Sequence, residues 1–115
     1  MPAELHLLNV KTVSADIEND ILKEICYTCG VSIQDIQAPN KGKREISDAR
    51  HIAATLIQKY STLSYDNIGK KFLGGRDHST IIHSLRATQS LLAFNKEFKA
   101  KFIHCETAIR TKFYL

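Results

Sequence analysis

The sequence predicts an all-α protein, a compact bundle of about six helices that contains a helix-turn-helix. Apolar residues recur every three or four positions in several segments, no segment alternates between apolar and polar residues as a strand does, and only two prolines are present. With 115 residues, 43% of them hydrophobic and 24% charged, the chain has the size and composition of one globular domain. We expect an N-terminal extension or linker remnant at residues 1–13 and the helical domain at residues 14–115.

The first two predicted helices lie in the N-terminal third of the chain. Residues 14–27 carry isoleucines at four-residue spacing after a candidate N-cap at Ser14, and Gly30 is a natural stop. These isoleucines are Ile17, Ile21 and Ile25. The segment "SIQDIQAP" predicts a short second helix that Ser32 caps and that ends before Pro39.

The clearest amphipathic helix is "SDARHIAATLIQKY", residues 47–60, which follows the polar and basic loop "NKGKRE". Its apolar face has the spacing i, i+3, i+4, i+7, i+8 and i+11 and consists of Ala49, Ile52, Ala53, Leu56, Ile57 and Tyr60. A last helix, at roughly 95–112, aligns Phe94, Phe98, Phe102, Cys105 and Ile109 on one side. We expect this stripe to pack in the core against the central helix; a dimer seam or a partner surface is the alternative.

Between these helices, the chain has the organisation of a helix-turn-helix at about residues 64–92. Ser64 caps a helix at about 65–72, "LGG" breaks it, and another helix runs from about 77 to 92. The inner side of that later helix carries Ile81, Leu85, Thr88 and Leu92. Two helices joined by a tight turn that contains glycine are the local signature of this motif.

The residues at the start of the later helix place an acid, an imidazole and a hydroxyl side by side, like the parts of a hydrolase. Consecutive residues of a helix point about 100° apart, so Asp77, His78 and Ser79 cannot relay a proton in line. His78 and His83 are five residues apart, whereas two metal ligands on one helix need a spacing near four. We therefore expect no catalytic residue, no metal site and no enzymatic activity.

The same residues suit the first turn of a recognition helix. The Asp77 carboxylate can cap free backbone N–H groups. His78, Ser79 and Thr80 then project from the part of a helix-turn-helix that meets base edges in the major groove. Asp77 can also accept a hydrogen bond from a cytosine amine, and a capping acid without any role in DNA binding is the alternative.

Positive charge is concentrated in the body of the chain. Residues 1–40 hold two Lys and six acidic residues, residues 41–76 hold eight Lys or Arg and three acidic residues, and residues 77–115 hold six and three. A basic body of this kind is typical of a surface that binds a polyanion. A solvated surface that happens to be basic is the alternative.

The segment "SYDNIGKKFLGGRDHSTIIHS", with "ARHIAATLI" upstream, resembles the C-terminal DNA-binding domain (domain IV) of the bacterial chromosomal replication initiator DnaA. The family pattern is a helix with Ile-Gly, then Gly-Gly-Arg-Asp-His-Thr-Thr-Val, one variable residue and His-Ala. The matching residues are Ile68, Gly69, Gly74, Gly75, Arg76, Asp77, His78, Thr80 and His83, with conservative replacements at Ser79, Ile81 and Ser84. The resemblance covers about residues 14 to 104 and implies a Trp-repressor-like helix-turn-helix that binds DnaA boxes at replication origins.

The resemblance also implies a role for each matching residue. Base contacts in the major groove fall to Asp77, His78, Ser79 and Thr80. Contacts to the DNA backbone or the minor groove fall to Lys41, Lys43, Arg44, Arg50, Lys70, Arg76 and His83. Departures from the family pattern occur at Leu73 before the double glycine, at Asp48, where a basic or neutral residue is common, and at His51, where glutamine is usual.

The complete initiator of this family carries an ATP-hydrolysing P-loop module, and no G-x-x-x-x-G-K-[ST] pattern occurs here. We therefore expect a domain that binds double-stranded DNA without a cofactor. It is either an excised part, with the ATPase domain of the same initiator as its partner, or a stand-alone relative. A different helix-turn-helix regulator or a transposase-like module is the alternative.

Location is predicted from what the sequence lacks. No apolar run approaches the roughly 20 residues of a membrane span, and no secretory signal pattern is present. Three cysteines, an odd number, favour a reducing compartment over a disulfide framework. We expect a cytoplasmic, nucleoid-associated protein that binds no membrane.

A second motif is the C-x-x-C of "CYTC", at Cys26 and Cys29, which is compatible with a redox pair or half a zinc site. No βαβ pattern surrounds it, and only His104 and Cys105 are available to complete four zinc ligands. We expect Cys26 to pack in the core instead.

Overall fold

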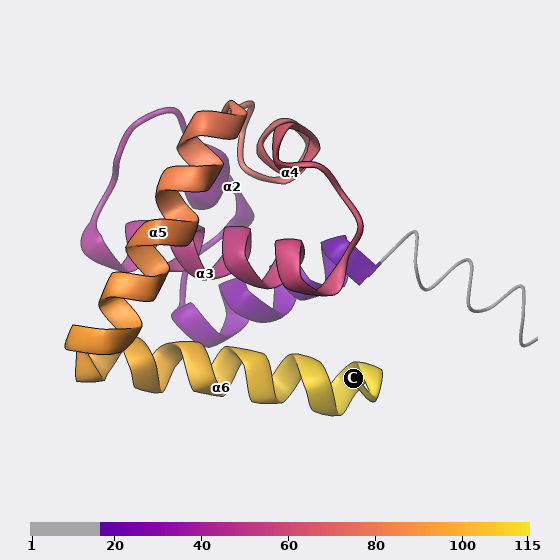
Figure 1. Ribbon diagram of the computed structural model, residues 1–115, viewed down its shortest axis with the longest axis vertical. Coiled ribbons are helices and arrows are strands. Elements are labelled where there is room, and N and C mark those ends of the chain that lie inside the picture. The colour runs from indigo at the N-terminus through magenta and orange to yellow at the C-terminus, as the bar shows by residue number, and fades with distance from the viewer. Residues whose placement is uncertain (1–16) are drawn as a thin grey trace, which may run out of the picture.

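The computed structural model describes residues 17–115, and every regular element in that range is a helix. Residues 17–29 are helical, and five further helices follow: α2 (Ile33–Gln37), α3 (Arg44–Tyr60), α4 (Tyr65–Phe72), α5 (His78–Phe94) and α6 (Lys96–Phe113) (Figure 1). The predicted all-α fold is confirmed. The predicted cap at Ser14 and the predicted extension at residues 1–13 lie outside the described residues.

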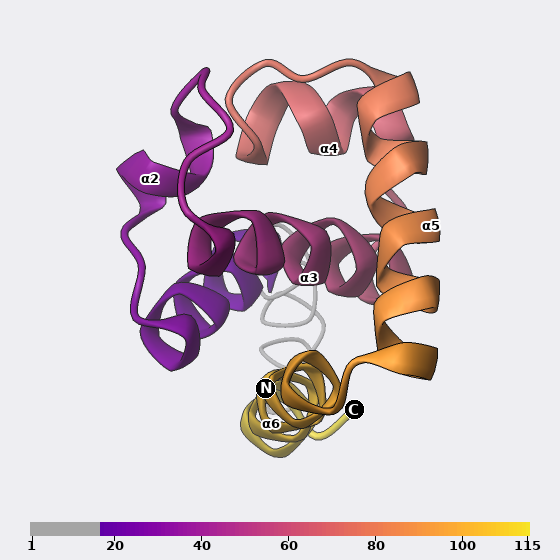
Figure 2. The same cartoon turned by 90° about the vertical axis from the view of Figure 1, so that its left-hand side faces the viewer.

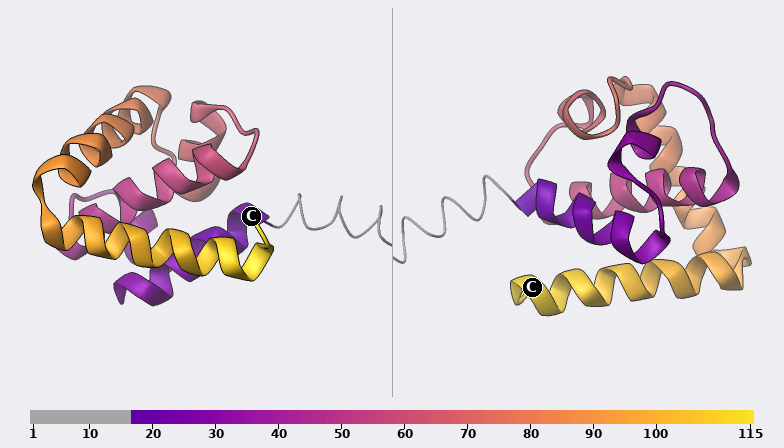
Figure 3. Two further views of the ribbon diagram at one scale, coloured as in Figure 1. Left: turned by 60° about the horizontal axis from the view of Figure 1, so that its bottom comes forward. Right: turned by 180° about the vertical axis from the view of Figure 1, so that it is seen from behind.

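Helix α3 lies at the centre of the bundle. Helices α4 and α5 pack against it and against each other. Helix α6 crosses the end of the bundle opposite α4, beside the helix of residues 17–29 (Figures 1, 2 and 3). The apolar face predicted for α3 is confirmed: Ala49, Ile52, Ala53, Leu56 and Ile57 are all fully buried, and Tyr60 at its end is half-buried against the core. The core also contains Ile21, Ile25, Ile36, Ile68, Ile81, Phe98 and Ile109.

Side-chain caps set where several helices start. The Ser32 hydroxyl accepts a hydrogen bond from the backbone N–H of Asp35 at 3.0 Å, and the Asp35 carboxylate accepts one in return at 3.1 Å. The Ser64 hydroxyl caps α4 by accepting from the N–H of Asn67 at 3.2 Å. These bonds satisfy backbone donors that a helix leaves unpaired in its first turn. The predicted starts at Ser32 and Ser64 are confirmed.

Two helix boundaries differ from the sequence prediction. Helix α3 begins at Arg44 instead of residue 47, so the basic loop is shorter than expected. Helix α5 extends to Phe94, and Asn95 both ends α5 and caps α6. Phe94 therefore does not belong to the α6 stripe: it is 88% exposed, and the prediction that it packs in the core is wrong. The rest of the stripe, Phe98, Phe102, Cys105 and Ile109, is buried as predicted.

The turn between α4 and α5 packs closely against its neighbours. Gly74 has a φ of 72°, and a Cβ atom there would overlap the backbone carbonyl of Gln37. A Cβ atom at Gly69 would overlap the carbonyl of Arg76, so α4 meets the turn at a distance that only glycine permits. Leu73, one of the departures from the family pattern, is 1% exposed and donates its N–H to the Gly69 carbonyl. Its side chain is thus part of the core.

Candidate nucleic-acid interface

The first turn of α5 is exposed to solvent. Asp77, His78, Ser79 and Thr80 all lie on the surface, where α5 starts beside the end of α4 (Figures 1 and 2). The Asp77 carboxylate accepts hydrogen bonds from the Thr80 N–H at 3.0 Å and from the Thr80 hydroxyl at 3.1 Å. The predicted capping role is confirmed, and these hydrogen bonds lower the pKa of Asp77. Because the cap fixes this turn, His78 and Ser79 project from an ordered helix end.

The Asp77 cap makes the stability of the domain depend on pH. Because the pKa of Asp77 is lower in the folded protein than in the unfolded chain, the ionised cap contributes stability above the ordinary aspartate pKa. That contribution is lost as the pH falls through the folded-state pKa. Asp77→Asn keeps a capping acceptor without a titrating group, so we expect it to lose less stability than the wild type between about pH 7 and about pH 3. Urea unfolding measures this, and equal losses would contradict the assignment.

A hollow of about 470 Å³ lies between α5 and the loop that joins α2 to α3. Lys41 lines it from the loop, and Thr80 and His83 line it from α5. Its other lining residues are Pro39, Asn40, Ser47, Arg50, His51, Leu73, Arg76 and Ser84. The structure therefore brings a predicted loop cation and two predicted residues of the recognition helix to one concave surface.

His51 connects α3 to α5 in this hollow. Its Nδ1 atom lies 3.1 Å from the Ser84 Oγ atom, and the His83 ring packs edge-on with a centroid separation of 6.4 Å. Burial lowers the pKa of His51, which favours the neutral form of its ring. Asp48 is buried and lies 3.4 Å from the Lys101 ammonium group. Asp48 and His51, two of the departures from the family pattern, therefore both have polar partners within the protein, Lys101 and Ser84.

Exposed cations occupy the elements that surround the hollow and the start of α5. Lys41 and Lys43 are exposed in the loop, and Arg44 is exposed in the first turn of α3. Lys70 is exposed in the last turn of α4 and pairs with Asp66 at 2.9 Å. Arg86 is also exposed on α5 and is absent from the residues predicted from the sequence. Arg86 lies three residues after His83, so both side chains lie on one face of α5. This spacing could have indicated Arg86 from the sequence.

Arg50 and Arg76, for which a contact with the DNA backbone or the minor groove is predicted, donate hydrogen bonds to carbonyls of the protein itself. Arg50 is 7% exposed, and its guanidinium donates to four backbone carbonyls within the protein. The donors of Arg50 thus bind carbonyls of the protein itself, and its contact with DNA stays a prediction. Arg76 is half-buried and also donates to four backbone carbonyls.

The two cysteines of the C-x-x-C motif lie in different surroundings. Cys26 is buried in the core as predicted, and burial raises its pKa to about 11. The Cys29 Sγ atom instead lies 4.0 Å from that of Cys105, across the contact with α6. His104 is exposed. Among residues 17–115, no group of three or more His, Cys, Asp or Glu residues is placed to hold a metal ion.

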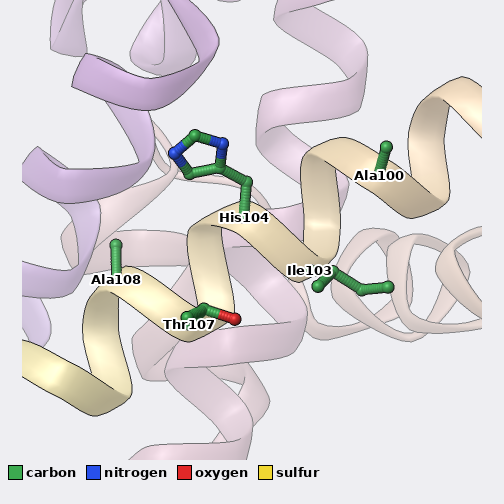
Figure 4. A pocket seen from close by; sticks show the side chains of 5 residues that line it. All are labelled: Ala100, Ile103, His104, Thr107 and Ala108. Atoms are coloured by element: carbon green, nitrogen blue, oxygen red, sulfur yellow. The ribbon is translucent and has the colours of Figure 1, made fainter.

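A second hollow, of about 550 Å³, lies on α6. Figure 4 shows that its labelled side chains all come from this helix: Ala100, Ile103, His104, Thr107 and Ala108. It combines one imidazole with small and apolar groups and contains no acidic or cationic cluster.

In the part of the chain that the structure describes, no helix is both long enough and apolar enough to span a membrane.

Comparison with known proteins assigns this arrangement to a family. The model of the bacterial DnaA protein helix-turn-helix matches residues 18–87, more than half of the chain. The chain belongs to this family. The match includes the double-glycine turn between α4 and α5 and ends within α5. The family predicted from the sequence is confirmed.

Curated relatives agree with this assignment. A chromosomal replication initiator protein DnaA from Bacteroides thetaiotaomicron is 33% identical over 89% of this chain and 21% of its own length. The DnaA of Picosynechococcus is 36% identical over 79% of the chain and 20% of its own length. The DnaA of Nostoc punctiforme is 44% identical over 56% of the chain and 14% of its own length. The chain thus spans about a fifth or less of these relatives.

Proposed function

We propose that this chain binds double-stranded DNA sequence-specifically, without catalysis, at DnaA-box-like sites of a bacterial replication origin. The observation that carries the proposal is the exposed first turn of α5, which lies beside a concave basic surface. Membership of the DnaA helix-turn-helix family supports the same function.

In this proposal, the start of α5 enters the major groove. The imidazole of His78 and the hydroxyl of Ser79 are the exposed groups that hydrogen-bond base edges. Thr80 presents its methyl group, because its hydroxyl already donates to Asp77. Asp77 has carboxylate lone pairs besides those that accept from Thr80, so it can also accept from a cytosine amine.

The remaining cations hold the duplex in register. Three of these residues are exposed near the start of α5: Lys70 at the end of α4, and His83 and Arg86 on α5. They face the two DNA strands that border the major groove on either side of the inserted helix. Lys41, Lys43 and Arg44 reach an adjacent minor groove, which α5 does not fill. These contacts position the protein and supply the salt-dependent part of the affinity.

Fluorescence anisotropy with two duplexes tests the proposed function. One duplex contains a DnaA box and the other has the same base composition in scrambled order. We expect tighter binding to the box and a steep decrease of both affinities with salt. Equal affinity for the two duplexes at every salt concentration would contradict sequence-specific recognition.

The basic loop is expected to contribute to binding through charge. Lys43→Ala and Arg44→Ala should each weaken binding to every duplex and reduce the slope of log affinity against log salt by about one unit. Lys99→Ala, which removes an exposed cation from α6, is the matched control and should leave the slope unchanged. An unchanged slope in the loop variants would mean that the loop does not contact phosphates.

The same family membership supports a proposal about the biological setting. The curated relatives are replication initiators about five times as long as their matching part, so we propose that the chain acts with an initiator ATPase domain or as a separate DnaA-like protein. We propose a cytoplasmic, nucleoid-associated location, where its DNA target is found. No observation favours a transcription regulator or a transposase-like module.

A further inference from the structure

Arg50 and Arg76 converge on one short piece of backbone from two different elements. From α3, Arg50 donates to the carbonyl oxygens of Asp35 at 2.7 Å, Ile36 at 2.8 Å, Ala38 at 3.1 Å and Lys41 at 2.6 Å. From the turn before α5, Arg76 donates to those of Leu73 at 2.6 Å, Ala38 at 2.8 Å, Ile36 at 3.4 Å and Asn40 at 3.4 Å. The carbonyls of Ile36 and Ala38 accept from both guanidinium groups.

The guanidinium groups of Arg50 and Arg76 carry like charges and lie close together, so other interactions must offset their repulsion. Burial and the nearby charge of Arg76 lower the pKa of Arg50, so the arrangement opposes the charged form. Among the described residues, no ion pair includes either arginine. The charge of Asp35 and the carbonyl oxygens that accept charge-assisted hydrogen bonds compensate for this. A guanidinium can reach several carbonyls because its donors are fixed in a planar fork.

The backbone that the two arginines clamp, residues 35–41, belongs to the loop side of the proposed interface and is hydrogen-bonded to the turn before α5. It leads from the end of α2 into the loop that carries Lys41 and Lys43. Arg76 also bonds its own turn through Leu73, and it immediately precedes Asp77, which caps α5. A displacement of the loop is thereby coupled through Arg76 to the residue before the recognition helix.

We propose that Arg50 and Arg76 are positioning residues that fix the basic loop relative to the first turn of α5, so that both engage one duplex as a preorganised unit. The inference rests on the proposed DNA-binding function and extends it to residues whose donors bind the protein itself. A loop that is already ordered in the free protein loses less conformational entropy when it binds DNA. Loss of the clamp therefore weakens the contribution of Lys43 without changing Lys43.

Arg76→Lys separates this role from a direct phosphate contact. Lysine keeps the positive charge but cannot span the carbonyls of Leu73 and Ala38 with a planar fork. For a clamp, we expect Arg76→Lys to lose about five- to tenfold in affinity for the box duplex at about 0.1 M salt, as much as Arg76→Ala. For a phosphate contact, lysine would largely restore binding, and this result would overturn the proposal.

A double-mutant cycle with Lys43→Ala adds a test that a merely structural role would not pass. In the wild type, Lys43→Ala should reduce affinity about five- to tenfold at about 0.1 M salt, and in Arg76→Lys it should have almost no further effect. Additive losses would overturn the clamp, while the wild-type preference for the box would still support the proposed function. If the wild type itself has no such preference, the proposed function fails before the cycle begins.

A measurement on the wild type covers the case in which Arg76→Lys does not fold. The clamp predicts that backbone amides of residues 38–41 are as ordered as those of α3, apart from Pro39, which has no amide proton. Their ¹⁵N order parameters should lie near about 0.85, the value of a rigid backbone, in protein without DNA. Values below about 0.6 in this segment would overturn the inference.

Discussion

His78→Ala is expected to lose about 1–3 kcal/mol of binding free energy on a DnaA-box duplex and to bind a scrambled duplex almost as well as the wild type. The reason is that His78 is exposed in the first turn of α5, where an imidazole can hydrogen-bond a base edge. A contact of this kind distinguishes sequences, whereas a phosphate contact does not. Anisotropy titrations with both duplexes at one salt concentration measure the two losses.

Gln89→Ala is the matched control for this substitution. Gln89 is exposed on α5 but lies about three turns further along the helix, beyond the part that enters a groove. Its replacement should leave both affinities unchanged. If His78→Ala weakens both duplexes equally, His78 is a backbone contact and the base-reading role must pass to Ser79 and Thr80.

The largest expected effect on folding is that of Gly74→Ala, which should reduce the free energy of unfolding by roughly 2–5 kcal/mol. Two costs combine at this position. The φ of 72° is unfavourable for a residue with a Cβ atom, and that atom would also overlap the Gln37 backbone, which cannot rotate away as a side chain can. The loss is a large part of the stability of a small domain. Urea unfolding followed by circular dichroism measures it.

Gly75→Ala separates the two costs. Gly75 has a φ of 88°, but no atom lies within 4 Å of the position of its Cβ. Only the backbone strain remains, so we expect a loss of about 1–2 kcal/mol. If the two variants are equally destabilised, the close approach of the turn to α2 does not exist as described.

Much of the fold could be predicted because it depends on local patterns. The face of α3 follows from helical spacing, and the starts of α2 and α4 follow from Ser32 and Ser64, whose hydroxyls bond backbone groups three residues away. The exposure of His78 could also be expected, since it follows a capping acid on the polar side of α5.

What could not be predicted depends on contacts between distant residues. Phe94 continues the aromatic spacing of α6, but Asn95 ends one helix and caps the next, and this places Phe94 in solvent. Arg50 looks like any other cation of the basic body, because the carbonyls that receive its hydrogen bonds are 9 to 15 residues away. Arg76 bonds carbonyls as far as 40 residues away. Such partners have no signature in the spacing of the sequence.

The most direct test of the account is an NMR titration of the ¹⁵N-labelled domain with the box duplex, because it reports where on the surface the DNA lies. We predict the largest amide shifts at residues 77–80 and in the loop at 41–44, with a much weaker response at 77–80 when the scrambled duplex is added. Unchanged signals at residues 77–80, together with shifts concentrated on α6, would contradict the claim that the start of α5 enters the major groove.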